Sequence, residues 1–129
     1  MFNLQINLDK SNIDQIQVSN KVNEFLKPHV NEQQTFRIIT CIMEVLANLI
    51  EHTDDSLKKV ILIIHCDTHE VIIDILDDAN FTQLTIPDEC PDNKETSGRG
   101  LWILRQWMDS VNYQPTVSGT HLRLTLNRE

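Results

Sequence analysis

Glycine is scarce in this sequence, in which 129 residues include only three. Two of the three, Gly98 and Gly100, stand one residue apart, directly before an apolar pattern with helical spacing. Glycine is favoured where a chain turns tightly or where another group comes close to the backbone. The pairing of two glycines in so glycine-poor a chain marks the segment "SGRGLWIL", residues 97–104, as a candidate site.

Clustered cysteine, clustered basic charge and long apolar runs are also absent. The three cysteines are scattered, which argues against a disulfide framework and favours a reducing compartment. No run of Lys or Arg interrupts a formal net charge of −8, so neither nucleic acid nor an anionic membrane is expected as a partner. No stretch approaches the ~18 apolar residues of a membrane span, and the first residues lack the pattern of a signal peptide. We therefore expect an acidic, cytoplasmic protein.

The order of apolar patterns predicts the fold. The length suits a single domain, 1–129, and a hydrophobic content of 40% is enough for a packed core. Strands are predicted at 2–8, 57–65, 70–76, 111–117 and 120–126. Helices are predicted at 12–27, 31–53 and 100–109, the first capped by Ser11 and the second by Asn31. With strands on one side and helices on the other, we expect an α/β (α+β) two-layer sandwich.

The helix predicted at 31–53 carries a narrow polar stripe beside a wide apolar arc. Glu44 and Asn48 lie four residues apart in this stripe and therefore stack on one face of the helix. The stripe is either a solvated face or one wall of a cleft. In a cleft, Glu44 is a candidate general base, and Asn48 offers an amide oxygen of the kind that binds hard cations.

Two polar residues continue the apolar rows of predicted strands. Asp77 follows Val71, Ile73 and Ile75 on one face, and Thr120 precedes a similar row in the last strand. If each strand extends this far, both side chains point toward the helices, where an acid needs hydrogen-bonding partners. If each strand has already ended, both side chains face water.

Glycines directly before a helix predict a phosphate site. Gly98 and Gly100 would let a ligand approach the backbone, where the N-terminus of the following helix offers free N–H groups and a positive dipole end. A tight entry into the helix is the alternative explanation for the same glycines.

The order of these residues resembles the GHKL ATPase superfamily, the fold shared by gyrase, heat-shock ATPase chaperones, histidine kinases and mismatch-repair ATPases. Within it, the chain looks most like the small bacterial anti-sigma factor serine/threonine kinases. "MEVLANLIEH" resembles the asparagine box, with Glu44, Asn48 and His52 at its fixed positions. "ILDDANF" takes the place of the first glycine box and supplies Asp77, "SGRGLWILRQWMD" resembles the second, and "GTHLRLTL" resembles the closing strand with Thr120. The resemblance implies the Bergerat ATP-binding fold, with a mixed β-sheet and helices packed on one face.

The resemblance also implies a role for each matching residue. Glu44 would polarise the attacking hydroxyl as general base, and Asn48 would hold the Mg²⁺ that bridges the ATP phosphates. Asp77 would accept the adenine amino group with support from Thr120, and residues 82–97 would form a lid. The nucleotide-binding positions implied are Asn48, His52, Asp77, Ala79, Gly98, Arg99, Gly100, Leu101 and Thr120.

The function implied is that of an ATP-binding anti-sigma regulatory factor with protein serine kinase activity. Its cofactors would be ATP and Mg²⁺. Its partners would be a sigma factor, which it sequesters, and a small antagonist protein, which it phosphorylates; a homodimer is also implied. The alternative is a non-catalytic regulatory binding module on the same fold, with weak or lost ATP binding.

Two departures from the family pattern favour that alternative. The first glycine box usually reads D-x-G-x-G, but here Asp77 is followed by Asp78, Ala79, Asn80 and Phe81. If the turn needs a positive φ, Ala79 is destabilising by roughly 1 kcal/mol, and its methyl group is placed to crowd the adenine. The lid sequence is acidic, which disfavours a triphosphate unless Mg²⁺ or Arg99 offsets the charge.

Two other groups of residues have less specific patterns. The turn "HCDTH" holds His65, Cys66 and His69, for which a transition-metal site is one interpretation and a solvated turn is the default. Trp102 and Trp107 lie five residues apart, so we expect them on different faces of their helix, one in the core and one toward a partner.

Overall fold

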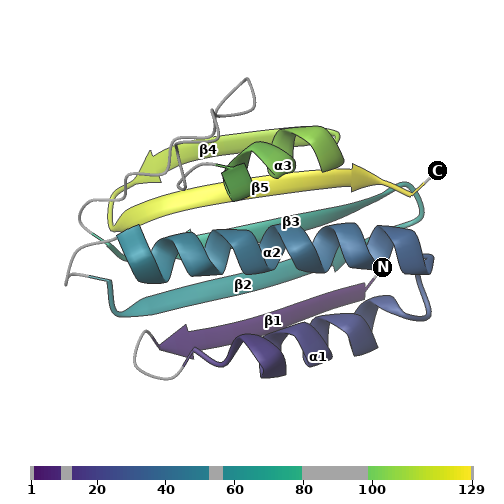
Figure 1. The fold of residues 1–129 in the computed structure, drawn as a ribbon, viewed down its shortest axis with the longest axis horizontal. Helices are drawn as coiled ribbons and strands as arrows, with labels where there is room; N and C mark the ends of the chain where they lie inside the picture. The colour runs from purple at the N-terminus through teal and green to yellow at the C-terminus, as the bar shows by residue number, and fades with distance from the viewer. Residues whose placement is uncertain (1, 10–12, 53–56, 80–98, 129) are drawn as a thin grey trace.

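The computed structural model describes residues 2–9, 13–52, 57–79 and 99–128. These residues form two layers, a five-stranded sheet and, on one of its faces, the helices (Figure 1). In chain order the elements are β1 (Phe2–Asp9), α1 (Gln15–Leu26), α2 (Glu32–His52), β2 (Lys59–Cys66), β3 (Glu70–Asp77), α3 (Arg99–Trp107), β4 (Ser110–Thr116) and β5 (Gly119–Asn127). The two-layer class and the strands and helices predicted from the sequence are confirmed.

The sheet is antiparallel, which corrects the mixed sheet implied by the resemblance. The strand order is β1-β2-β3-β5-β4, and each neighbouring pair runs in opposite directions. Between β1 and β2 the chain passes through two helices and so returns antiparallel (Figure 1). α3 connects β3 to β4, which run the same way, but β5 is inserted between these two strands and pairs antiparallel with both.

Side-chain caps explain where the first two helices begin. Asn31 accepts a hydrogen bond from the backbone N–H of Gln34 at 2.8 Å, and the Gln34 side chain accepts one from the N–H of Asn31 at 3.2 Å. This reciprocal capping box confirms Asn31 as the cap of α2. The cap of α1 is Asp14 and not Ser11, because the Asp14 carboxylate accepts from the N–H groups of Ile16 and Gln17.

The core lies between the helices and one face of the sheet. In β2 and β3 every second residue is buried, as expected of strands with one covered face. The buried face of α2 contributes Ile38, Cys41, Ile42, Val45, Leu46 and Leu49. Among the described helices, none is both long and apolar enough to cross a membrane.

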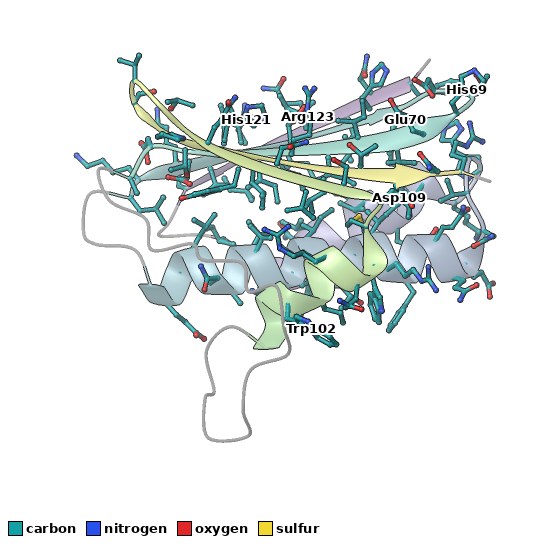
Figure 2. The ribbon with its side chains drawn as sticks, turned by 90° about the horizontal axis from the view of Figure 1, so that it is seen from above. His69, Glu70, Trp102, Asp109, His121 and Arg123 are labelled. Carbon is teal, nitrogen blue, oxygen red and sulfur yellow. The ribbon has the colours of Figure 1, made fainter. Side chains whose placement is uncertain are left out.

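The other face of the sheet carries a charged cluster. Asp74 accepts hydrogen bonds from Arg123 Nε at 2.8 Å and interacts with His121 Nε2 at 2.7 Å. Burial alone would raise the pKa of Asp74, but these two partners outweigh it and lower that pKa. Figure 2 shows His121 and Arg123 on the side of the sheet away from the helices. Substitutions here therefore serve as controls for the helix-facing side.

Candidate functional site

The side chain of Asn48 has a buried polar atom whose lack of a partner the fold alone does not explain. Its side chain and that of Glu44 are half-buried, one turn apart on α2, which argues against a fully solvated stripe. The Nδ2 atom of Asn48 is buried and has no hydrogen-bond partner in the part of the chain that the structure describes. Leaving such a group unpaired is destabilising by ~1–3 kcal/mol, so few native structures keep one without a reason. A ligand that pairs with the Asn48 amide would supply the reason.

Glu44 lies close enough to the core to affect Cys41. Burial, and then the charge of Glu44, raise the pKa of the Cys41 thiol to about 12. The thiol therefore stays protonated near neutral pH and is no nucleophile. The reactive groups on this face of α2 are therefore the Glu44 carboxylate and the Asn48 amide.

Asp77 points toward the helices, as the strand pattern allowed. Its side chain is 8% exposed at the end of β3, and β5 places Thr120 directly opposite. The Thr120 hydroxyl donates to Oδ2 of Asp77, and the backbone N–H of Ala79 donates to Oδ1 at 3.1 Å. The water-facing alternative is therefore wrong for this pair. A buried carboxylate with fixed donors is a suitable acceptor for a ligand's N–H group.

Ala79, which replaces the first glycine of the family pattern, has a defined place after Asp77. Ala79 is 2% exposed, and its methyl group packs in the hydrophobic core. Asp78 fixes the same turn by accepting from the backbone N–H groups of Lys58 at 2.8 Å and Lys59 at 2.9 Å. Burial would raise the pKa of Asp78, but these backbone donors outweigh it and lower that pKa.

The glycine that this region requires is Gly119, which the sequence analysis passed over. A Cβ atom on Gly119 would lie 1.8 Å from the carbonyl oxygen of Asp77 and 2.9 Å from Cα of Asp78. Such a distance is far inside van der Waals contact, so only glycine lets β5 approach the end of β3 here. The available signal was a third glycine directly before Thr120.

A second residue missed from the sequence is Tyr113 on β4. It lies opposite Leu122 of β5, on the same face of the sheet as Thr120. Burial, together with the charge of Asp77, raises the pKa of the Tyr113 phenol. Nothing in the sequence pattern distinguished Tyr113, because this placement depends on β5 lying between β3 and β4.

Several predicted site residues lie outside the described part. Gly98 and the whole of the predicted lid, 82–97, fall within residues 80–98, which the structure does not describe. α3 begins at Arg99, so Gly100 lies in its first turn, as the sequence predicted for a glycine at a helix entry. The side chains of His52, Arg99 and Leu101 are not described. Their roles remain predictions.

Glu44 also borders a groove between α1 and α2. The groove has a volume of about 730 Å³. Its lining includes the apolar side chains of Val30, Ile39 and Met43 and the polar side chains of Asn23 and Glu44. Glu44 can therefore be reached from the groove between α1 and α2 as well as from the side on which Asn48 lies.

The metal interpretation of the β2–β3 turn is wrong. Asp67 uses Oδ1 to accept from the backbone N–H groups of His69 at 2.7 Å and Glu70 at 2.8 Å. His65 interacts with Asn3 at 2.6 Å, and Cys66 is buried. Within the described residues no group of His, Cys, Asp and Glu is arranged to hold a metal ion. These hydrogen bonds are those of a β-turn held by the Asp67 side chain.

The two tryptophans of α3 are both half-buried. Trp107 packs on the core and contacts the ring of Phe36 with 5.7 Å between ring centroids. Trp102 lies on the outer side of α3, away from the sheet (Figure 2). This agrees with the expectation of different faces.

The described residues fit a nucleotide with a divalent cation. The Asn48 amide can present its oxygen after rotation of the side chain, and an amide oxygen is a suitable Mg²⁺ ligand. Asp77 and Thr120 supply a buried polar pair on the sheet side, opposite the helical layer. The candidate ligand-binding groups are therefore divided between α2 and the adjoining ends of β3 and β5.

Solved structures similar to this chain share its fold. The RsbU and RsbW domains of Rv1364c from Mycobacterium tuberculosis match with a TM-score of 0.71 and 14% identity, covering 100% of this chain and 34% of that one. The histidine kinase domain of the Erythrobacter litoralis EL346 blue-light activated kinase matches with a TM-score of 0.55 and 17% identity, covering 88% of this chain and 59% of that one. The catalytic domain of histidine kinase ThkA matches at 0.54 and 13% identity, covering 99% and 97%. This chain thus spans about a third of the first of these structures.

Sequence comparison identifies the family. No curated protein sequence matches the chain. The family model of the histidine kinase-like ATPase domain matches residues 10–126, which is most of the sequence. The resemblance to the GHKL ATPases is therefore confirmed, and the chain belongs to the histidine kinase-like ATPase domain family, a family of kinase-like ATP-binding domains.

Proposed function

We propose that the chain is an ATP-dependent protein serine/threonine kinase that acts as an anti-sigma regulatory factor. It forms one domain, acts in the cytoplasm, phosphorylates a small antagonist protein, sequesters a sigma factor and forms a homodimer. The similarity to a structure that contains an RsbW domain supports a regulatory kinase over a sensor kinase.

One observation carries the proposal. The Nδ2 atom of the Asn48 amide is buried without a partner among the described residues, one turn along α2 from the half-buried Glu44. This combination places a cation ligand beside a carboxylate that can accept a proton, which are the two groups that transfer of phosphate to a hydroxyl requires.

Each residue of the site has a separate task. Asn48 would hold Mg²⁺, and Asp77 with Thr120 would bind the adenine ring. When bound, ATP would supply the phosphoryl group and Mg²⁺ would neutralise the charge of the phosphates. Glu44 would orient the serine hydroxyl of the substrate and accept its proton. The predicted phosphate-binding residues Gly98, Arg99, Gly100 and Leu101 would offer their backbone N–H groups to the phosphates.

The groove between α1 and α2 suits a polypeptide substrate. Glu44 lines it, and the apolar side chains of Val30, Ile39 and Met43 in the same lining offer contacts beyond the reacting hydroxyl. A protein segment lying there would bring a serine to Glu44 from the side away from the sheet.

The second candidate function is a binding module without catalysis. Ala79 favours it, because a buried methyl group stands where the family has a glycine of the first glycine box. The intact pair of Glu44 and Asn48 favours the kinase.

A phosphotransfer assay tests the proposal. The purified chain is incubated with Mg-ATP labelled at the γ-phosphate and with small antagonist proteins from the source organism. The expected result is label on one serine of one antagonist, located by mass spectrometry. If a partner binds with equal affinity with and without nucleotide, and no phosphate is transferred to it, the chain is a binding module instead.

Asp77 should make the site prefer ATP to GTP. Guanine presents a carbonyl where adenine presents an amino group, so two acceptors would face each other. We expect GTP to bind at least ~10-fold more weakly than ATP, the size of a lost hydrogen bond to a charged group. Asp77→Asn, whose amide can donate, should remove most of this preference in a calorimetric titration.

Asp74→Asn is the matched control, because Asp74 lies three positions before Asp77 on β3 and therefore on the opposite face of the strand. It should keep the preference for ATP. Equal affinity of the unmodified chain for ATP and GTP would rule out the Asp77 contact.

A further inference from the structure

The outer face of the sheet, the face away from the helices, has an apolar centre. The described helices all lie on the other face, and Figure 2 shows His121 and Arg123 on this one. In β2 and β3 the residues that point outward are half-buried, apart from the exposed Lys59 at the start of β2. Four of them are aliphatic and surround Asp74, and we call them the central cluster: Ile61, Ile63, Ile72 and Leu76.

Polar side chains border the central cluster on both edges of the sheet. The outward residues of the two edge strands β1 and β4 include five exposed amides: Asn3, Gln5, Asn7, Asn112 and Gln114. An apolar centre inside a polar rim is the usual composition of a surface that binds another protein. The outer face has this composition across its full width.

The one charge inside the central cluster is already paired. Asp74 accepts from Nε and Nη2 of Arg123 at 2.8 and 3.1 Å and interacts with His121 Nε2 at 2.7 Å. Its side chain is 15% exposed. A carboxylate with such partners can be covered without leaving an unpaired charge, which is the costly case. Asp74 therefore does not prevent a second protein from lying on this face.

The charge of the outer face suits a second copy of the chain. Its described residues include two bases, Lys59 and Arg123, and three acids, Asp9, Glu70 and Asp74. The whole chain has a formal net charge of −8, so two copies repel each other through most of their surface. The nearly balanced outer face brings two copies together with little of that repulsion. Around a two-fold axis, bases of one copy can also face acids of the other.

The outer face is large enough for a dimer. It consists of five strands of 7–9 residues. With ~4.8 Å between strands and ~3.3 Å per residue, the face measures about 24 by 25 Å, or roughly 600 Å² on each copy. Two such faces bury roughly 1,200 Å², the lower end for specific protein interfaces. Sheets stacked face to face in this way pack ~10 Å apart.

We propose that the outer face is the interface of a homodimer in which two sheets pack face to face around a two-fold axis. The inference deepens the homodimer of the proposed function and does not depend on kinase activity. Both helical layers then lie on the outside of the dimer. Asn48 and Asp77, on the helix-facing side of each sheet, stay clear of the interface.

Lysine substitutions in the central cluster test the interface by analytical ultracentrifugation. We expect the unmodified chain to be a dimer with a Kd in the micromolar range or below. Ile63→Lys and Ile72→Lys should each raise this Kd by at least ~100-fold, because the two-fold axis places each new charge in the apolar centre twice.

The monomer should tolerate both substitutions. Ile63 lies opposite Asp74, and Ile72 lies between Glu70 and Asp74 on one face of β3, so each lysine has a carboxylate as neighbour. Circular dichroism and a cooperative thermal transition check that the variants are folded. Small-angle X-ray scattering of the unmodified dimer needs no variant, and we expect a compact particle with the sheets stacked.

Ile16→Lys is the matched control. Ile16 is 74% exposed on α1, and the same change there should leave the Kd of the dimer unchanged. Mg-ATP is titrated into Ile63→Lys as well, and its affinity should stay within about threefold of the unmodified chain. A chain that dimerises as expected but binds no Mg-ATP would overturn the proposed kinase and leave the interface standing.

Three other results would overturn the interface. The first is an unmodified chain that stays monomeric up to high micromolar concentration. The second is a dimer that persists in folded Ile63→Lys and Ile72→Lys, or an elongated particle in scattering, since either would place the contact at an edge strand or on the helices. The third is a dimer that Ile16→Lys disrupts as strongly as the two substitutions in the central cluster.

Discussion

Replacing Glu44 with alanine is expected to slow phosphate transfer to the protein substrate by about 10²–10⁴-fold, the usual contribution of a general base. Affinity for Mg-ATP should stay within about threefold of the unmodified chain, because Glu44 acts on the hydroxyl and not on the nucleotide. The two quantities are measured separately, by the initial rate of serine labelling and by calorimetry. Loss of the rate with affinity retained assigns the proton transfer to Glu44.

Two further variants sharpen this result. Glu44→Gln keeps the size of the side chain and removes its basicity, so it should be nearly as slow as Glu44→Ala. Glu24→Gln, at an exposed position of α1, should transfer at the unmodified rate. If Glu44→Ala transfers phosphate as fast as the unmodified chain, Glu44 is not the base.

Gly119→Ala is expected to destabilise the fold strongly, since its Cβ would lie 1.8 Å from the carbonyl oxygen of Asp77. The clash is with backbone, which cannot rotate away, so β5 or the end of β3 must shift. We expect the free energy of unfolding to fall by about 3 kcal/mol, the upper end for overpacking, and Tm to fall by roughly 10 °C. Denaturant and thermal unfolding measure both.

The same substitution should also weaken nucleotide binding, because the backbone that shifts carries Asp77. Ser118→Ala, in the exposed turn beside Gly119, is the matched control and should alter stability by no more than about 0.5 kcal/mol. A Gly119→Ala variant that melts with the unmodified chain would show that β5 tolerates a side chain there.

The elements of this fold were predictable because their apolar patterns are regular. The alternation in β2 and β3 and the wide apolar arc of α2 each correspond to one buried face. Boundaries depended on local chemistry: Asn31 with Gln34 formed a capping box, whereas the cap of α1 was Asp14, three residues after the predicted Ser11. The place of β5 between β3 and β4 was not predictable, because it depends on a pairing between strands far apart in the sequence.

The candidate site likewise contains residues that could be predicted from the sequence and residues that could not. Glu44, Asn48 and Asp77 were predicted because each departs from the apolar row or arc around it. Gly119 was missed because its importance comes from a close approach across strands, to the backbone of Asp77. Such contacts have no spacing in the sequence that reveals them. The buried methyl group of Ala79 was likewise visible only in the packed core.

Titration of the purified chain with Mg-ATP tests the central claim, nucleotide binding at Asn48 and Asp77, most directly. The expected result is saturable binding of one nucleotide per chain, with stability raised by about 2.7 kcal/mol at a hundredfold excess over Kd. Binding should be weakened in Asn48→Ala and should lose its preference for adenine in Asp77→Asn. No heat of binding and no change in melting temperature through millimolar Mg-ATP would contradict the claim and leave the binding module as the function.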